Sequence, residues 1–270
     1  MKRILTALVA VPVLIFIIGS KNPIYFDLCV VLAATLALEE YFSLTVKSEF
    51  LAYRFWGHVL ALLLLLAFYL SPNNQSIPFL LLCLAGVLFL VLGLRKGGEV
   101  RQVLPRASVT LLGLAYIPAT LGLLMVVRSE VEVGAQGSHW IFFILLVVWF
   151  GDTGAYYAGR ALGRHKLAPA ISPKKTVEGS LGGILGNSLA ALLAHKICLP
   201  GHPISRLLVL AWVLGLVSQV GDLAESALKR GASVKDSSNL LPGHGGMLDR
   251  IDGVLFAAPV LYFYTKFFPL

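Results

Sequence analysis

Long apolar runs recur from one end of this 270-residue chain to the other. Runs of about 16–25 residues are long enough to cross the ~30 Å hydrocarbon core of a bilayer as α-helices. Hydrophobic residues make up 57% of the chain and its mean hydropathy is +0.83, whereas soluble domains are about 45–50% apolar. The pattern excludes a soluble globular fold and predicts an all-α integral membrane protein, a polytopic bundle of transmembrane helices.

About nine transmembrane helices are predicted, with approximate ends. The predicted spans are Ile4–Gly19, Tyr25–Leu38, Phe55–Leu70, Pro78–Leu94, Thr110–Val127, Trp140–Ala158, Gly179–Ile197, Leu207–Leu228 and Val254–Phe268. The second is short and ends at the acidic pair Glu39-Glu40. The first follows Lys2 and Arg3 but lacks a small-residue cleavage site, so we interpret it as a retained helix rather than a signal peptide.

The polar connections divide the chain into two parts. Up to about residue 108 they are short, and beyond it two long polar loops follow. We therefore predict that residues 1–108 form N-terminal membrane helices with a mainly structural or oligomerisation role. Residues 109–270 are predicted to form a C-terminal catalytic membrane domain. The three cysteines lie in or at apolar runs without a CxxC motif, which indicates packing residues rather than disulfides.

The basic residues are distributed unevenly between the two sides of this topology. One set of alternating connections holds 17 of the 22 lysines and arginines: Lys2, Arg3, Lys47, Arg54, Arg95, Lys96, Arg101, Arg106, Arg160, Arg164, Lys166, Lys174, Lys175, Lys229, Arg230, Lys235 and Arg250. Cytoplasmic loops carry such an excess, so the N-terminus and both long loops are expected to be cytoplasmic. The net charge of +8 is then explained by topology and anionic lipid rather than by nucleic acid. A multi-pass protein of the cell inner (cytoplasmic) membrane is predicted.

Charge is concentrated between Ser226 and Asp252. In a chain with 13% charged residues, this stretch and the adjoining Glu225 contain four acidic residues, four basic residues and one histidine. Charge at a membrane is expensive and usually marks function. Carboxylates bind hard divalent cations, whereas lysine and arginine bind phosphate. The stretch predicts metal-assisted chemistry on a phosphorylated substrate at the bilayer surface.

Part of this charge lies within the eighth predicted span. Asp222, Glu225, Ser226 and Lys229 are spaced i, i+3, i+4 and i+7, so they share one helix face. That face should line a cavity or meet polar partners rather than lipid. A purely structural alternative is a buried ion pair between Glu225 and Lys229.

A glycine-rich loop precedes the ninth span. His244 lies within the run Gly243–Gly246, and glycines allow a backbone to approach a ligand closely. Asp249 and Asp252 follow at i and i+3, and such carboxylates can hold Mg²⁺ that bridges phosphate oxygens. Ordinary turn geometry is the alternative for the glycines. His244 could be a base, a phosphate donor or a turn residue.

The sixth predicted span ends in a polar segment. Asp152 lies well inside the apolar run, with Tyr156 at i+4. These residues are expected to form a polar wall of the same cavity. A helix-packing hydrogen bond between Asp152 and a threonine or tyrosine is the alternative.

The connection to the seventh span also carries phosphate-binding residue types. Ser172 before Pro173 predicts a helix N-cap with proline at the first helical position. Lys174, Lys175 and Thr176 would then lie at the positive end of that helix, where an anionic phosphate is stabilised. Small residues repeat at four-residue spacing beyond them, which predicts close helix packing: Gly179, Gly182, Gly183 and Gly186.

Together these motifs resemble the phosphatidate cytidylyltransferase (CDP-diacylglycerol synthase) family. The residues that match its long C-terminal pattern without a gap are Ser226, Lys229, Arg230, Lys235, Asp236, Ser238, Leu241, Pro242, His244, Gly245, Gly246, Met247, Asp249, Arg250 and Asp252. The resemblance is strong over Trp149–Gly253 and otherwise rests on hydropathy and on the acidic pair Glu39-Glu40. Val177 departs from the family, which commonly has tryptophan there.

The resemblance implies a reaction in phospholipid biosynthesis. CMP is transferred from CTP to phosphatidic acid, giving CDP-diacylglycerol and pyrophosphate, by in-line attack of the lipid phosphate on the α-phosphorus of CTP. It further implies Mg²⁺ held by Asp222 and Asp249, with a second cation such as K⁺ near Asp249. The lipid phosphate is already ionised, so no general base is required, which favours a pyrophosphate-binding role for His244.

The resemblance and the residue types together define the expected site. Catalytic roles are expected for Asp222, Lys229, Arg230, Lys235, Asp236, His244, Asp249, Arg250 and Asp252. Substrate binding is expected of Asp152, Tyr156, Ser172, Lys174, Lys175, Thr176, Ser226, Gly245 and Gly246. The expected partners are CTP, phosphatidic acid, membrane lipids and a second copy of the chain in a homodimer, with no nucleic acid.

Three other functions would each explain part of the sequence. A cation transporter or channel would explain the carboxylates Asp152, Asp222 and Glu225 within spans, but not the clustered lysines, glycines and aspartates on one side. A CDP-alcohol phosphotransferase shares only an Asp-Gly pair, at Asp252-Gly253, and lacks the rest of that motif. A CTP-dependent lipid kinase would be distinguished by its use of a diacylglycerol-type alcohol instead of phosphatidic acid.

Overall fold

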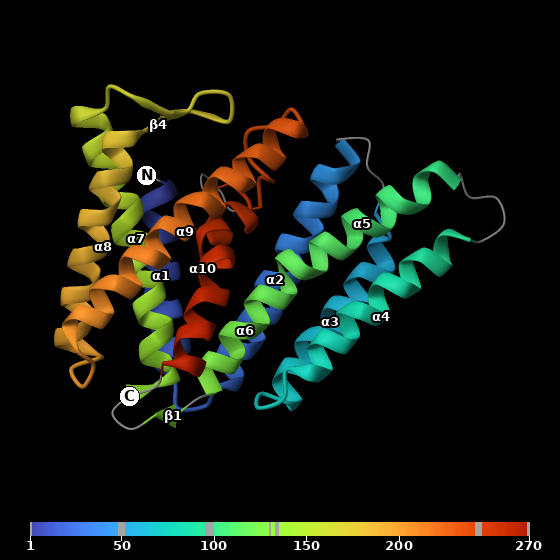
Figure 1. Ribbon diagram of the computed structural model, residues 1–270, viewed down its shortest axis with the longest axis horizontal. Helices are drawn as coiled ribbons and strands as arrows, with labels where there is room; N and C mark the ends of the chain where they lie inside the picture. Colours follow the sequence, from blue (N-terminus) through green and yellow to red (C-terminus); the bar gives the residue numbers. More distant parts are fainter. Residues whose placement is uncertain are drawn as a thin grey trace. The chain divides into compact units, whose positions relative to one another are not determined.

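The computed structural model describes residues 2–47, 52–94, 100–129, 131–132, 135–240 and 245–268. These residues are helical almost throughout (Figure 1). The helices are α1 (Lys2–Gly19), α2 (Ile24–Lys47), α3 (Arg54–Leu70), α4 (Ser76–Gly93), α5 (Val100–Tyr116), α6 (Pro118–Ser129), α7 (Gly137–Leu162), α8 (Val177–Ile197), α9 (Ile204–Gly231) and α10 (Leu248–Phe267). The prediction of an all-α polytopic fold is confirmed.

Each predicted span coincides with a helix, but two differ in detail. The fifth is divided into α5 and α6 at Ile117-Pro118, because proline has no N–H to continue the helical hydrogen bonds. The second was predicted to end at Leu38, and this is wrong, since α2 continues to Lys47. The acidic pair does not end the helix because both carboxylates have partners: Glu39 pairs with Arg54 at 2.8 Å, and Glu40 accepts hydrogen bonds described below.

Within the described residues, two short β-hairpins, which the sequence did not predict, interrupt the helices. Strand β1 (Val131–Glu132) pairs with β2 (Ala135–Gln136), and β3 (Lys166–Ala168) pairs with β4 (Ser172–Thr176), both antiparallel. The predicted N-cap at Ser172 is therefore wrong. Thr176 caps α8 instead: its Oγ1 accepts a hydrogen bond from the Gly179 N–H at 3.1 Å, as an N-cap side chain should.

The chain divides into two compact units. The first unit comprises residues 1–126 and 228–250, and the second comprises residues 127–227 and 251–270. Helices α9 and α10 each contribute residues to both units, so the charged stretch after Ala227 belongs with the N-terminal helices. The functional division of the chain at residue 108 stays a prediction.

The core of the first unit is built around α2, α3 and α5. Tyr41 and Phe42 of α2 are almost completely buried, and the Tyr41 hydroxyl donates to the Val109 carbonyl oxygen at 3.1 Å. Gly113 lets α5 approach Tyr41, since a Cβ there would lie 2.8 Å from its ring. Helices α3 and α4 pack against each other, and α5 packs against both of them (Figure 1). This packing fixes the end of α2 that carries Glu40.

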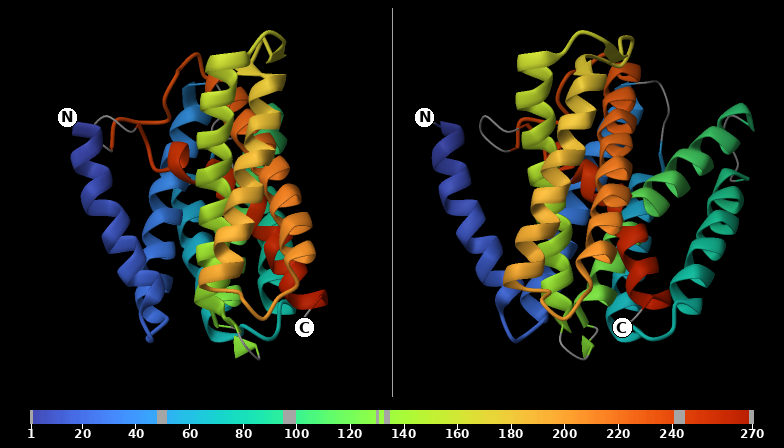
Figure 2. Two further views of the ribbon diagram at one scale, coloured as in Figure 1. Left: turned by 90° about the vertical axis from the view of Figure 1, so that its left-hand side faces the viewer. Right: turned by 60° about the vertical axis from the view of Figure 1, so that its left-hand side comes forward.

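The second unit is organised by the pair α7 and α8, which lie side by side over their length (Figure 2). The small residues of α8 explain the close approach. A Cβ at Gly182 would lie 2.7 Å from the Gly154 carbonyl oxygen of α7, and a Cβ at Gly186 would lie 2.8 Å from the carbonyl carbon of Phe150. The glycine spacing thus serves helix packing, as predicted.

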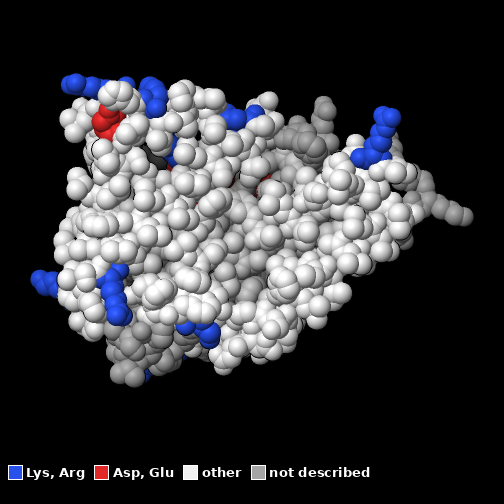
Figure 3. Space-filling view, in the orientation of Figure 1, with Lys and Arg blue, Asp and Glu red and all other residues white. Residues whose placement is uncertain are grey.

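The outer surface of the second unit is suited to lipid. Six helices or helix pairs among the described residues are long and apolar enough to cross a membrane. A stripe of exposed leucines follows α8: Leu181, Leu185, Leu189 and Leu192. On the face shown in Figure 3 a broad uncharged zone separates lysine and arginine at the two ends of this unit. That all nine spans cross the membrane, and that the N-terminus is cytoplasmic, stay predictions.

Candidate active site

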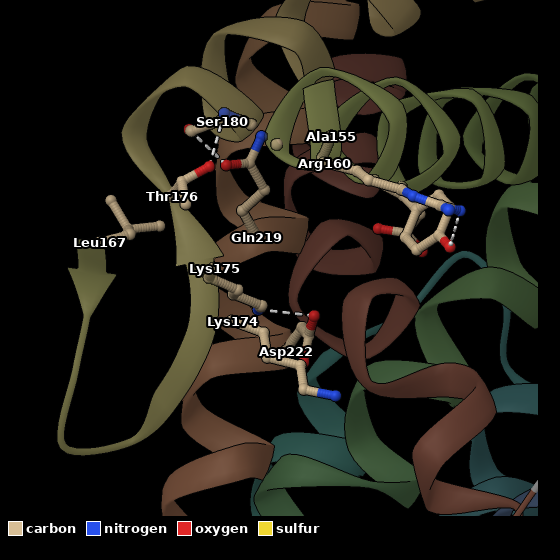
Figure 4. A pocket seen from close by; sticks show the side chains of 13 residues that line it. Ala155, Arg160, Leu167, Lys174, Lys175, Thr176, Ser180, Gln219 and Asp222 are labelled. Carbon is tan, nitrogen blue, oxygen red and sulfur yellow. Dashed lines mark hydrogen bonds and ion pairs between the residues drawn. The ribbon is translucent and has the colours of Figure 1, made fainter. Parts of the chain in front are cut away.

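A pocket of about 450 Å³ opens in the second unit between α7, the β3–β4 hairpin, α8 and α9 (Figure 4). Its charged and polar lining comprises Asp152, Tyr156, Arg160, Lys174, Lys175, Thr176, Ser180, Gln219 and Asp222. The pocket brings Asp152 and Asp222 to one cavity, as the sequence indicated. Three basic side chains and two carboxylates in one cavity suit an anionic ligand that carries a cation.

The β3–β4 hairpin is held against the start of α8 by Glu178. Its carboxylate accepts hydrogen bonds from the backbone N–H groups of Arg164, at 3.0 Å, and His165, at 3.2 Å. The Nδ1 atom of His165 lies 2.6 Å from Glu178 Oε1, and the Val177 N–H donates to the His165 carbonyl oxygen at 2.9 Å. The hairpin that carries Lys174 and Lys175 is therefore anchored at its base.

Within the pocket, a lysine and an aspartate form an ion pair. Lys175 Nζ lies 2.6 Å from Asp222 Oδ2, which joins β4 to α9 (Figure 4). Arg160 NH1 donates to the Tyr156 hydroxyl at 3.4 Å. Ser180 Oγ donates to the Gln219 side-chain oxygen at 2.5 Å and so orients that amide. Lysines from a strand thus face a carboxylate from a helix across the cavity.

Asp222 also belongs to a cluster of three carboxylates in the same unit. One oxygen each from Asp222, Glu225 and Asp252 lies within 4.8 Å of the other two. Glu225 is fully buried, and Ser226 Oγ lies 3.4 Å from Asp222 Oδ1 as a donor. Helix α10 can bring Asp252 close to α9 because residue 221 of α9 is glycine. A Cβ on Gly221 would lie 2.7 Å from the Asp252 carbonyl oxygen.

The donor set of this cluster fits a hard divalent cation. Carboxylate oxygens are the ligands that Mg²⁺ prefers, and Mg²⁺ is usually held by one or two carboxylates together with waters and substrate phosphates. Carboxylates this close repel one another, and the Lys175 ammonium 2.6 Å from Asp222 offsets part of that repulsion. Asp222, Glu225 and Asp252 are therefore the residues that would hold the metal in the second unit.

A separate network surrounds Asp249 in the first unit. Lys229 Nζ donates to Asp249 Oδ1 at 2.5 Å, and both side chains are nearly buried, 11% and 6% exposed. Oδ2 accepts hydrogen bonds from the N–H of Gly246 at 2.8 Å and from the N–H and hydroxyl of Ser237 at 2.9 and 2.8 Å. Gly245 has a φ of +79°, and a side chain there would meet this carboxylate.

This network keeps Asp249 ionised. Burial by itself raises the pKa of the carboxyl group, but the hydrogen bonds from Lys229, the Gly246 N–H and Ser237 outweigh it and lower the pKa to about 2. The charge is thus matched by one cation and three further donors, which is what a buried carboxylate requires. Both oxygens of Asp249 are occupied by protein donors, whereas the sequence assigned this residue to metal.

The other residues expected at the site are distributed as follows. Lys229 and Asp249 lie together, and Ser226 adjoins Asp222. Exposed side chains on the first unit belong to Arg230, Lys235, Asp236 and Arg250, and Arg230 donates to the Val234 carbonyl oxygen at 3.1 Å. Ser172 lies on β4 but does not line the pocket. His244 lies outside the described residues, as do Leu241, Pro242 and Gly243.

Sequence reasoning missed three contributors to these two sites. Glu225 was recognised on the polar face of its helix but was not assigned to metal, and Glu40 was noted only as part of an acidic pair. Arg160 was counted for topology alone. Asp222 was identified because a charged residue deep within an apolar run is costly and usually functional. The same reasoning could have identified Glu40.

A profile of the Cytidylyltransferase family matches residues 1–268. The chain therefore belongs to the cytidylyltransferase family, whose members are nucleotidyltransferases, and the resemblance stated from the motifs is confirmed.

Several similar proteins bear the name phosphatidate cytidylyltransferase. The protein of Staphylococcus epidermidis strain RP62A is 36% identical over 263 residues, 96% of each chain. That of Staphylococcus aureus strain COL is 33% identical over 259 residues, 96% of each chain. That of Bacillus subtilis strain 168 is 48% identical over 132 residues, 49% of each chain.

Proposed function

We propose that this protein transfers CMP from CTP to phosphatidic acid, releasing pyrophosphate and forming CDP-diacylglycerol. The observation that carries the proposal is the pocket in which Arg160, Lys174 and Lys175 meet Asp222, one of three clustered carboxylates. Nucleotidyl transfer needs this combination, because both reactants are anions and pyrophosphate leaves with further charge. The family match over nearly the whole chain supports the same reaction.

The basic and acidic residues of the pocket have different roles in the proposed reaction. Lys174, Lys175 and Arg160 bind phosphate oxygens and reduce the repulsion between the triphosphate and the lipid phosphate. The ion pair between Lys175 and Asp222 orients that lysine before the substrate arrives. The lipid phosphate is the nucleophile and is already ionised, so the chain need not supply a general base.

We further propose Mg²⁺ as the cofactor, held by Asp222 together with Glu225 and Asp252. When bound, the metal neutralises charge on phosphate oxygens. Support comes from the separation of the three carboxylates and from the burial of Glu225. A role of Asp249 toward Mg²⁺ or a second cation such as K⁺ stays a prediction, and in the structure its oxygens accept hydrogen bonds from protein donors.

The setting of the reaction is also proposed. The positive-inside bias favours an active site facing the cytoplasm in the inner membrane, where CTP is available. A homodimer remains our expectation. The glycines of α8 pack against α7 within one chain, so a dimer would have to use other helix faces.

Product analysis tests the reaction. The full chain, reconstituted in lipid, is incubated with radiolabelled CTP, phosphatidic acid and Mg²⁺. We expect a lipid-soluble CDP product and an equal amount of pyrophosphate, each requiring all three components. Replacing phosphatidic acid with diacylglycerol should abolish the reaction. CDP release with diacylglycerol would instead establish a lipid kinase, and ion flux without either product would establish a transporter.

A pair of hairpin lysines tests the role of the pocket. Lys175→Met should lower kcat/KM for CTP by about 10–100-fold, because a hydrogen bond to a charged group contributes about 1.5–3 kcal/mol. Lys166→Met is the matched control, since Lys166 lies on β3 of the same hairpin but does not line the pocket. Steady-state kinetics with varied CTP would measure both. Equal losses in the two variants would remove the pocket from the CTP site.

A further inference from the structure

Glu40 of α2 is the centre of a buried hydrogen-bond network in the first unit. Its Oε1 accepts from the Ser238 hydroxyl at 2.6 Å and the Met247 N–H at 2.9 Å. Its Oε2 accepts from the Ser237 hydroxyl at 2.9 Å and the Leu248 N–H at 2.8 Å. The residue is only 6% exposed. One carboxylate therefore joins α2 to a loop and a helix about 200 positions later in the chain.

Two of these hydrogen bonds cap α10 from outside its own segment. A helix begins with N–H groups that have no partner within the helix, and a negative charge at that end is stabilised by the helix dipole. Met247, immediately before α10, has no side-chain acceptor that could cap it. Glu40 supplies the acceptor for Met247 and Leu248, while Asp249 accepts the N–H of Gly246.

The Ser237 hydroxyl connects Glu40 to the Lys229–Asp249 pair. It lies 2.9 Å from Glu40 Oε2 and 2.8 Å from Asp249 Oδ2. A hydroxyl has one proton, so at any moment it donates to one of the two carboxylates. Asp249 Oδ1 in turn accepts from Lys229. The network thus runs without interruption from Glu40 through Ser237 to Asp249 and Lys229.

The close approach in this network requires glycine at position 246. A Cβ on Gly246 would lie 2.6 Å from the Cδ atom of Glu40 and would also meet the Ser237 hydroxyl. The glycine therefore has a second role besides its N–H donor. It leaves space for a carboxylate that arrives from α2.

We infer that Glu40 is a positioning residue for the proposed transfer reaction. It acts through Ser237 and through the first turn of α10, and it sets the placement of Asp249 and Lys229 without touching substrate. The inference rests on the proposed function for its catalytic consequence. The hydrogen bonds themselves do not depend on which reaction is catalysed.

The variant Glu40→Gln tests this inference most directly. Glutamine keeps the shape of the side chain but replaces one acceptor oxygen with an NH₂ group, which faces donors and cannot accept their hydrogen bonds. We expect kcat to fall by about 10–100-fold, the range typical of residues that orient catalytic groups, with KM for CTP changed less than about twofold. Glu39→Gln is the matched control: its side chain is 51% exposed and pairs with Arg54, and kcat should stay within about twofold.

A pair of adjacent serines separates positioning from simple stabilisation. The hydroxyls of Ser237 and Ser238 both lie within hydrogen-bond distance of Glu40, but in the described part of the chain only that of Ser237 is hydrogen-bonded to Asp249 as well. Ser237→Ala should therefore lower kcat about as much as Glu40→Gln, and the double variant should lose little more. Ser238→Ala should cost less than about threefold. Equal losses in the two serine variants, or an unchanged kcat in Glu40→Gln, would overturn the inference.

Hydrogen exchange distinguishes this inference from the proposed function. In Glu40→Gln the amides of residues 237–250 should exchange at least about tenfold faster, with α7 and α8 unchanged, since the capping acceptor is lost. Unchanged exchange would refute the network even if the wild type makes CDP-diacylglycerol. A wild type without that activity, combined with faster exchange in the variant, would refute the proposed reaction and leave the positioning contact standing.

Discussion

Asp222→Asn should reduce the rate of CDP-diacylglycerol formation by at least about 10²–10³-fold, the cost of removing one group that stabilises transition-state charge. Asp222 belongs both to the pocket, through its ion pair with Lys175, and to the carboxylate cluster. Asparagine keeps the shape but removes the charge needed to hold a divalent cation. Initial rates over a range of Mg²⁺ concentrations would measure the loss, which excess Mg²⁺ should not restore.

A second readout does not depend on activity. Mg²⁺ should raise the thermal unfolding temperature of the wild type, because a ligand that binds only the folded state stabilises it. The shift should disappear in Asp222→Asn and persist in Glu39→Gln, whose carboxylate pairs with Arg54 elsewhere in the chain. A variant that keeps both the shift and more than a tenth of the wild-type rate would exclude Asp222 as a metal ligand.

Lys229→Met should destabilise the protein by about 3–5 kcal/mol, because it leaves the buried Asp249 carboxylate without its cation. Lys229 and Asp249 are 11% and 6% exposed, and their charged atoms lie 2.5 Å apart. Asp249→Leu should be similarly damaging. Both single variants should also lose activity, and denaturant unfolding in a mild detergent would measure the stability change.

The double variant Lys229→Met/Asp249→Leu separates stability from catalysis. Replacing a buried ion pair with apolar groups of similar volume is often neutral or stabilising, so most of the lost stability should return. Activity should not return, since the motif residues themselves are gone. Full recovery of both properties would show that the pair is a structural contact only.

The fold was largely predictable because the bilayer imposes simple rules. A span must be apolar, about 20 residues long and helical, so hydropathy located the helices of the described residues, with α5 and α6 taken as one span. Hydropathy could not show that Pro118 divides the fifth span, since proline occurs within α1, α5 and α10 as well. It also could not find the β3–β4 hairpin, whose strands are short and depend on the contact between Glu178 and the backbone of His165.

The candidate site was predictable in residue type but not in pairing. The motif identified Lys229, Asp249 and Asp252, and the depth of a charge within an apolar run identified Asp222. Spacing alone could not decide which carboxylate faces a lysine and which faces another carboxylate, because Asp249 and Asp252 are one helical turn apart and have different neighbours. The role of Glu40 depends on contacts across about 200 residues, which no local pattern contains.

The long separation between Glu40 and its donors has a consequence for biogenesis. Chains are made from the N-terminus, so α2 is synthesised and inserted 197 to 208 residues before Ser237 and Leu248 exist. An acid without donors is costly inside hydrocarbon, so the end of α2 must wait at the aqueous boundary during synthesis. Its hydrogen-bonded burial is complete only when residues 237–248 have been made, so this buried contact forms late in synthesis.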